Sequence, residues 1–158
     1  MCPPKPSGRI RAAAVEDSSQ LLRLWASLFN ENDIAGRESW SDHARLWFAS
    51  VVDDASTAYF PVLEDGGVII ATAIGTLELG VPNPHCPRGR TVRLANVITS
   101  PGYRRRGYGT LLVREVVQWA RSVRADRVDL SATAAGQRIY NEVGFVLTSA
   151  PRMKLVLD

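Results

Sequence analysis

Three consecutive arginines stand next to two closely spaced glycines in the segment Thr99–Thr110, which reads TSPGYRRRGYGT. Glycine lets the backbone approach a ligand closely, and the first turn of a following helix offers unpaired N–H groups and the positive end of its dipole. Phosphate groups bind to such features. The segment is therefore interpreted as an anion-binding loop in preference to a solvated basic turn.

The spacing of the glycines can be compared with the spacing in known phosphate-binding loops. Gly102 and Gly107 have the spacing of a P-loop, but Tyr108 and Gly109 stand where the lysine and the hydroxyl of that loop belong. A dinucleotide fingerprint fails as well, because Leu112 occupies the place of its third glycine. The sequence therefore argues against a nucleoside triphosphatase and against a dinucleotide-binding domain.

The loop connects two segments whose side chains follow clear periods. Residues 91–99 alternate as in a strand, and residues 109–124 place apolar side chains at helical spacing. The other expected strands are residues 10–15, 59–63 and 68–79 around an Asp65-Gly66-Gly67 turn, 128–131, and a last strand with Met153, Leu155 and Leu157. The other expected helices are 17–29 with a capping box of Asp17 and Gln20, 44–51, and 134–142 ended by Gly144. This order indicates an α/β fold with a mixed sheet.

The length and composition fit one globular domain. The chain has 158 residues, of which 46% are hydrophobic and 22% charged, so we expect a disordered tail at residues 1–8 and one domain at residues 9–158. No apolar run approaches the ~20 residues that cross a bilayer, and no apolar stretch opens the chain, so we expect no membrane partner and a cytoplasmic location. Cys2 and Cys86 lack the spacing of a redox or metal pair and are expected to be free thiols.

The net charge of +3 does not by itself indicate a nucleic-acid partner. The positive charge is concentrated at residues 104–106 and 88–93, and a small polyanionic ligand explains it equally well. Duplex binding usually needs a broader basic face and a recognisable reading element. Because no such element is visible, we expect no nucleic-acid partner.

Two motifs resemble those of the GCN5-related N-acetyltransferases, the GNAT superfamily. The Arg-x-x-Gly-x-Gly of residues 104–109 resembles the family's coenzyme A pyrophosphate loop, and the Tyr-x-x-x-Gly-Phe of residues 140–145 resembles its last helix-to-strand segment. The resemblance extends loosely from Ile10 onward. It implies a single-domain GNAT-like α/β fold with a mixed, mostly antiparallel central sheet of six to seven strands, about four flanking helices, and a splay between strands 4 and 5.

The resemblance also implies a place for acetyl-CoA as co-substrate. The pantetheine arm would lie in the splay and pair with the backbone of the fourth strand at Val97, Ile98 and Thr99. The pyrophosphate would bind to the loop, whose residues are Arg104, Arg105, Arg106, Gly107, Tyr108, Gly109 and Thr110. Arg105 departs from the pattern, because many relatives have a glycine there.

Tyr140 is the general acid that the resemblance implies, because it can return a proton to the coenzyme A thiolate. A phenol has a pKa of about 10 and a thiol one of about 8.5, so this transfer runs uphill by roughly 2 kcal/mol. The alternative is an aromatic side chain that only packs over the sheet. The Tyr-x-x-x-Gly-Phe context favours the catalytic role.

The general base is less clearly marked than the acid. Relatives often carry a glutamate on the fourth strand, but residues 93–96 offer no carboxylate. Glu31 and Glu78 are the candidates that we retain, and other nearby groups are Asp33, Glu38 and His85. Deprotonation relayed by water, or an acceptor amine of low pKa, would need none of them. No cluster of histidine, cysteine and carboxylate has metal-ligand spacing, so we expect no metal.

The resemblance thus implies an acetyl-CoA-dependent N-acetyltransferase that acetylates a primary amine of a small molecule or peptide by direct attack through a tetrahedral intermediate. The alternatives are a non-catalytic acyl-CoA-binding or sensing module, which the missing strand carboxylate favours, and a basic nucleic-acid-binding domain. The loops at residues 30–39 and 80–90 carry no motif that identifies the acceptor. The alternating C-terminal strand and the resemblance lead us to expect a homodimer.

Overall fold

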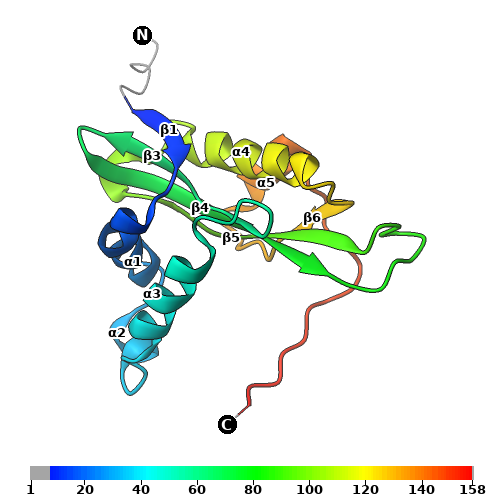
Figure 1. Cartoon of the computed structure of the whole chain (residues 1–158), viewed down its shortest axis with the longest axis horizontal. Coiled ribbons are helices and arrows are strands. Elements are labelled where there is room, and N and C mark those ends of the chain that lie inside the picture. Colours follow the sequence, from blue (N-terminus) through cyan, green and yellow to red (C-terminus); the bar gives the residue numbers. More distant parts are fainter. Residues whose placement is uncertain (1–7, 158) are drawn as a thin grey trace.

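The computed structural model describes residues 8–157, and in this part of the chain one sheet lies between two helical layers (Figure 1). Its strands are β1 (Arg9–Ala12), β2 (Ala58–Tyr59), β3 (Pro61–Asp65), β4 (Val68–Leu79), β5 (Arg90–Thr99) and β6 (Arg127–Asp129). Its α-helices are α1 (Ser18–Ala26), α2 (Glu31–Ile34), α3 (Trp40–Val51), α4 (Tyr108–Ser122) and α5 (Gln137–Val143). Short 3-10 helices cover Val15–Asp17 and Pro101–Tyr103. The expected tail at residues 1–8 lies outside the described residues apart from Gly8.

The sheet is mixed and mostly antiparallel, as the sequence predicts. Its strand order is β1-β3-β4-β5-β6, and the short strand β2 also pairs with β4. Only β5 and β6 run parallel, because the crossover helix α4 connects them. At the hairpin between β3 and β4, Gly66 and Gly67 both have positive φ angles, 56° and 84°, which a tight two-residue turn requires.

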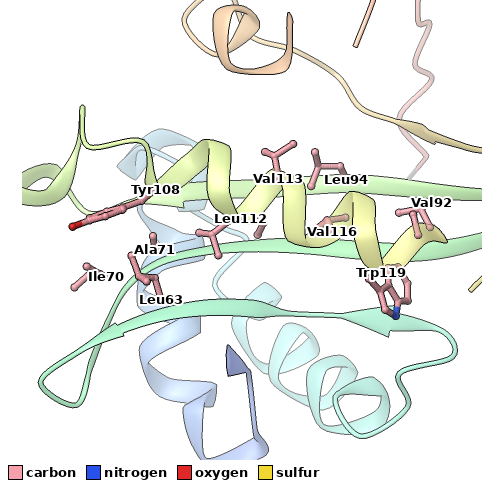
Figure 2. Packing of buried hydrophobic residues seen from close by; sticks show 12 residues of the cluster. Leu63, Ile70, Ala71, Val92, Leu94, Tyr108, Leu112, Val113, Val116 and Trp119 are labelled. Carbon is pink, nitrogen blue, oxygen red and sulfur yellow. The ribbon is translucent and has the colours of Figure 1, made fainter. Parts of the chain in front are cut away.

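Each face of the sheet has its own hydrophobic core. Helix α4 lies on one face, where Leu112, Val113 and Val116 pack over strands β3, β4 and β5 (Figure 2). Helices α1 and α3 lie on the other face, where Trp25, Phe48 and Phe60 form the centre of the second core. Figure 1 shows these two layers on opposite sides of the sheet.

Gly75 of β4 permits the close approach of helix α4. A β-carbon at this position would lie 2.8 Å from Val116 Cγ1 and 3.1 Å from the Trp119 ring. Any larger residue would push the helix away from the sheet. The amphipathic pattern of α4 and this glycine together fix the position of the helix whose first turn follows the arginine loop.

The capping box predicted for Asp17 and Gln20 is wrong. The Asp17 carboxylate turns back and accepts hydrogen bonds from Arg11 Nη1 at 2.8 Å and from the Ala14 N–H at 2.7 Å. The Gln20 amide instead accepts from the Ile69 N–H at 2.8 Å. Asp17 thus bonds to the preceding turn and to Arg11 of β1, and Gln20 bonds to β4, so both side chains connect the start of α1 to the sheet.

The predicted last strand, with Met153, Leu155 and Leu157, is also absent from the described residues. Residues 145–157 contain no helix or strand, and the chain beyond Arg152 runs away from the body of the molecule (Figure 1). The alternation is present in the sequence, but a strand also needs a partner edge. In this structure the segment has none.

Candidate functional site

Strands β5 and β6 separate part of the way along their length. They pair only at Thr91–Arg93 with Arg127–Asp129, so the second half of β5 has no partner on that side among the described residues. This is the splay expected between strands 4 and 5, where β2 is not counted because it is a two-residue addition to β4. The open edge leaves backbone N–H and C=O groups available to a ligand.

A β-bulge at Asn96 marks the point where β5 becomes available. The register with β4 shifts between the pairs Ile74–Ala95 and Thr72–Ile98, and Asn96 has a left-handed φ of 49°. Bulges turn the backbone and re-aim the groups that follow. The sequence carries a signal of this feature, since asparagine is enriched among residues with positive φ and Asn96 interrupts the apolar alternation of the strand.

The arginine loop, residues 99–110, directly follows this edge, and its own arginine side chains stabilise its shape by hydrogen bonds. Arg104 Nε donates a hydrogen bond to the Thr99 carbonyl at 3.1 Å, and Arg106 Nη2 donates to the Gly102 carbonyl at 3.3 Å. The Arg106 guanidinium also lies 5.3 Å from the centroid of the Tyr103 ring. Two of the three arginines therefore hold the loop in shape in addition to supplying positive charge.

Gly107 begins helix α4 with a left-handed φ of 81°, and no side chain caps the helix. The first intrahelical bond runs from the Leu111 N–H to the Gly107 carbonyl at 3.1 Å. The N–H groups of Tyr108, Gly109 and Thr110 precede it and point out of the helix end, where the macrodipole is positive. This arrangement fits an anion such as a pyrophosphate.

Arg105, at the position where the resemblance leads us to expect glycine, has a left-handed backbone conformation. Its φ is 64°, which is costly for a residue with a side chain. The arginine at this position therefore places backbone strain in the loop.

Several predicted contact residues point their side chains into the cores. Tyr108 is buried in the α4 core, and Ile98 is buried in the α1–α3 core. Val97 packs against the α4 core from the opposite side of the strand. These residues can reach a ligand only through their backbone, which is the role that the resemblance gives to them.

Three of the elements that carry predicted site residues meet at Gly109. A β-carbon on Gly109 would lie 3.3 Å from Ile139 Cδ1 and 4.0 Å from Val97 Cγ1. Gly109 belongs to the first turn of α4, Val97 to the free edge of β5, and Ile139 is the neighbour of Tyr140 on α5. The loop, the splayed strand and the tyrosine helix are therefore in contact.

Tyr140 lines a groove of about 530 Å³ between β6 and the segment that follows α5. Its ring meets Phe145 edge-on at 5.9 Å, and partial burial raises the pKa of its hydroxyl. No hydrogen bond within residues 8–157 uses that hydroxyl. A tyrosine that stays protonated and faces a groove is available to donate a proton. The contact with Phe145 holds one side of the Tyr140 ring.

The two candidate bases occupy different places. Glu78 is the last residue but one of β4 and accepts a hydrogen bond from Arg93 Nε at 2.8 Å, and Arg93 lines the same groove as Tyr140. Glu31 lies exposed on the short helix α2, in the opposite helical layer. Of the other candidates, Asp33 and Glu38 accept bonds from backbone N–H groups of their own loop, and His85 is exposed in the proline-rich loop. Sequence reasoning missed Arg93 as a groove residue.

Asp126 holds the proline-rich loop 80–90 beside the start of β5 through hydrogen bonds. This carboxylate accepts from the N–H groups of Arg88 at 2.9 Å and Arg90 at 3.2 Å, and from the Cys86 thiol at 3.2 Å. The buried Cys86 is a free thiol, as predicted.

Within the described part of the chain no group of three histidine, cysteine or acidic residues is placed to hold a metal ion, and no helix is long and apolar enough to span a membrane.

In this fold the splayed edge of β5, the uncapped start of α4 and the helix that carries Tyr140 lie together. The chain belongs to the acetyltransferase (GNAT) family, whose defining sequence pattern matches residues 20–145. No curated protein sequence matches the chain. The recognised motifs at residues 104–109 and 140–145 both lie within the matched range.

The fold is also similar to those of solved structures. A GCN5-related N-acetyltransferase from Ralstonia eutropha JMP134 is 22% identical with a TM-score of 0.79, covering 94% of this chain and 99% of that one. A predicted acetyltransferase from Clostridium acetobutylicum, solved with acetyl-CoA, is 21% identical with a TM-score of 0.81, covering 94% and 96%. Glucosamine-6-phosphate N-acetyltransferase from Arabidopsis thaliana is 17% identical with a TM-score of 0.77, covering 94% and 98%. At these identities the likeness establishes the shared fold.

Proposed function

We propose that this protein transfers the acetyl group of acetyl-CoA to a primary amine of a small molecule or peptide by direct attack. The observation that carries the proposal is the meeting of Gly109, Val97 and Ile139, because it brings the anion-binding turn, the free strand edge and the tyrosine helix to one place. A phosphate-bearing thioester that spans these elements would present its sulfur to Tyr140. The acetyl-CoA in the Clostridium acetobutylicum structure supports this choice of donor.

The backbone of the loop and of β5 would bind the donor. The N–H groups of Tyr108, Gly109 and Thr110 fit the pyrophosphate, and the exposed Arg105 adds positive charge. The free edge after Asn96 fits the amides of the pantetheine arm as an added strand. A backbone donor on that edge, placed against the thioester oxygen, typically supplies about 3 kcal/mol of transition-state stabilisation.

Tyr140 would supply the proton that the departing thiolate needs. Burial raises the pKa of its hydroxyl, so the phenol is fully protonated at neutral pH. The same shift makes it a weaker acid, and the transfer is uphill unless the proton of the attacking ammonium is passed on through the hydroxyl. Tyr140 would then act as a relay that begins and ends protonated.

For the general base, Glu78 has more support than Glu31. Its carboxylate lies next to Arg93, which lines the groove, whereas Glu31 lies on α2 in the other layer. The ion pair occupies only Oε1 of Glu78, and Oε2 is left to accept a proton through water. An amine of low pKa would need no base at all.

The acceptor amine is proposed from chemistry and from the related fold of the glucosamine-6-phosphate N-acetyltransferase, whose name describes an amino-sugar substrate. We also propose a homodimer and a cytoplasmic location. The buried free thiol of Cys86 supports a reducing compartment, because disulfides persist mainly in oxidising ones.

The test is thiol release from acetyl-CoA across a panel of amino sugars, polyamines, aminoglycosides and peptides, with mass spectrometry of the products. We expect release that depends on one class of amine, together with an acetylated product in equal amount. Hydrolysis of acetyl-CoA without acetylated product, or acetyl-CoA binding with no turnover on any amine, contradicts the proposal and favours an acyl-CoA sensor.

A further inference from the structure

A second cavity, of about 400 Å³, lies between helix α1 and the start of the arginine loop. Its walls come from one side of α1, from the first two residues of β4, and from residues 99–101 with Arg104. Helix α1 covers the face of the sheet opposite to helix α4 (Figure 1), and none of residues 107–110 lines this cavity. The cavity is therefore separate from the anion-binding end of α4.

The two charged side chains that line this cavity are both arginines. Arg23 comes from α1 and Arg104 from the arginine loop, and no carboxylate of residues 8–157 lines the cavity. The Arg23 side chain forms no hydrogen bond or ion pair in the described part of the chain, and the Arg104 side chain uses only Nε. Guanidinium groups pair in a planar, two-pronged way with phosphate and carboxylate groups. The cavity thus offers two cations that no acidic side chain of the described residues neutralises.

Arg104 is held at this cavity by the end of β5. Its Nε donates to the Thr99 carbonyl at 3.1 Å, and Thr99 itself lines the cavity. The next residue, Ser100, donates its N–H to the Ile70 carbonyl at 2.8 Å, so the backbone that holds Arg104 is anchored to the sheet. The Arg104 side chain therefore belongs to the wall of this cavity, while the backbone of the arginine loop stays available to a pyrophosphate.

The other walls suit a small molecule that has one acidic group. Thr99 and Ser100 line the cavity, and neither hydroxyl has a hydrogen-bond partner within residues 8–157. Leu24, Val68 and Pro101 supply apolar surface. Binding sites for small molecules have volumes of about 300–1,000 Å³ and combine apolar walls with a few polar groups. The volume and the lining therefore fit an occupant larger than a single inorganic ion.

We propose that this cavity binds a small molecule through a phosphate or carboxylate group held between Arg23 and Arg104, and that this molecule is not acetyl-CoA. The N–H groups at the start of α4 already fit the pyrophosphate of the donor, on the other face of the sheet. An acidic group between the two arginines neutralises positive charges that otherwise repel each other. It also connects α1 to the arginine loop.

An extension, which rests on the proposed function, identifies this molecule as the acceptor. Thr99 is the last residue of β5 and lies three residues after Asn96, so the cavity begins about 10 Å from the start of the free strand edge. The thioester of the donor is proposed to lie along that edge. An amine with an acidic group at a similar distance would bind the arginines and present its nitrogen to the thioester. The acceptor would then be a phosphorylated amino sugar or a short peptide with a free carboxylate.

The first test measures the binding of inorganic phosphate to the full chain by calorimetry and needs no activity. Saturating coenzyme A fills the end of α4, and chloride keeps the ionic strength constant. We expect phosphate to bind in the presence of coenzyme A, at least about fivefold more weakly in Arg23→Gln, and nearly as in the wild type in Arg23→Lys, which keeps the charge. Arg45→Gln, at an exposed arginine of α3, removes the same charge elsewhere and should leave the binding unchanged.

Equal phosphate affinity in the Arg23→Gln and Arg45→Gln variants overturns the proposed site. Phosphate binding that coenzyme A abolishes overturns it as well, because the donor then occupies the only anion site. If the chain binds no coenzyme A, the proposed function fails, and the same variants titrated with phosphate alone decide whether the cavity is an anion site.

The second test compares amines that differ only in the acidic group, namely glucosamine 6-phosphate with glucosamine, and a tripeptide with its C-terminal amide. We expect kcat/KM to be at least about tenfold higher for the acidic member of one pair. Arg23→Gln should remove this advantage by raising KM, with kcat little changed, whereas Arg45→Gln should retain it. Equal kcat/KM within both pairs rejects the acceptor assignment, and the phosphate titration still decides the site. Turnover of no amine rejects the proposed function and the extension with it.

Discussion

A β-carbon at Gly136 would lie 3.2 Å from Cε2 of Tyr140. Gly136 precedes the first residue of α5 and has an ordinary φ of −87°, so its backbone does not require glycine. The small residue is there because the Tyr140 ring lies across it. The relationship fixes the direction of the ring before any ligand binds.

Gly136→Ala should therefore shift the Tyr140 ring and lower turnover about three- to thirtyfold, with acetyl-CoA affinity within about threefold of the wild type. The unfolding free energy should change by less than about 1 kcal/mol, since a methyl group at this half-exposed site is compatible with a helix start. Gly80→Ala is the matched control, because a β-carbon there meets nothing within 4 Å. Equal turnover in both alanine variants would show that the ring position does not matter.

Tyr140→Phe should lower turnover about ten- to a thousandfold if the hydroxyl protonates the thiolate. Acetyl-CoA affinity should stay within about threefold, because the ring and its contact with Phe145 are retained. Tyr59→Phe removes a hydroxyl that donates to Glu115 at 3.3 Å, on the other side of α4, and should leave turnover unchanged. Steady-state kinetics with a saturating amine distinguish the two. Full activity of the Tyr140 variant, with chemistry rate-limiting, would assign the proton to water or substrate.

Gly107→Val should weaken acetyl-CoA binding at least tenfold, about 1.4 kcal/mol, because the side chain would stand at the anion-binding end of α4. In the free protein a β-carbon there meets nothing within 4 Å, so the stability loss comes only from the φ of 81°. Gly36→Val is the control, since Gly36 has a φ of 75° and equally open surroundings away from the loop. Calorimetry should separate them: a similar loss of stability in both, but weaker binding only at position 107.

Arg105→Gly should raise the unfolding free energy by about 1 kcal/mol, because glycine takes a φ of 64° without strain. It should also weaken acetyl-CoA binding a fewfold and reduce its salt dependence, since one cation is lost. Arg124→Gly relieves the same strain at a φ of 61° beyond α4 and should stabilise without affecting binding. Denaturant unfolding and calorimetry test both. A destabilised Arg105 variant would mean that its side chain makes contacts worth more than the strain.

The environment of the Asp17 carboxylate predicts how the free energy of unfolding changes at low pH. The hydrogen bonds from Arg11, followed by that from the Ala14 N–H, lower the pKa of Asp17 against the effect of burial. A lowered pKa adds stability that is complete above the unfolded value of about 3.9 and is lost as the pH falls towards the folded value. The unfolding free energy should therefore decrease as the pH falls below about 4. Asp17→Asn should reduce the loss of stability at low pH and lower the free energy of unfolding by about 1–3 kcal/mol at pH 7. Glu16→Gln, at an exposed neighbouring residue, should have neither effect.

The sequence predicts best the elements with a strong local pattern. The apolar period of α4, the two glycines of the β3–β4 turn and the left-handed Gly144, with a φ of 115°, all appear as expected. Their determinants lie within a few residues of one another. The arginine loop is also placed correctly, because its two neighbouring elements are well marked.

Features that depend on distant partners could not be predicted from local patterns. Asp17 and Gln20 have the spacing of a capping box, yet Asp17 accepts a hydrogen bond from Arg11 of β1 and Gln20 accepts one from Ile69 of β4. The Asn96 bulge exists only through its register with β4, and the groove at Tyr140 only through the packing of α5 beside β6. The C-terminal alternation predicts a strand, but no local signal tells whether a partner edge is available, and among the described residues none pairs with it.

The sheet divides the molecule into two cores that meet the same strand from opposite sides. Val97 packs into one core and Ile98 into the other, so neighbouring residues of β5 face different layers. Substitutions in layers that share few contacts combine nearly additively. Substitutions in α1–α3 and their loops can therefore accumulate with little effect on the arginine loop and α4, so the two layers are free to change independently of each other.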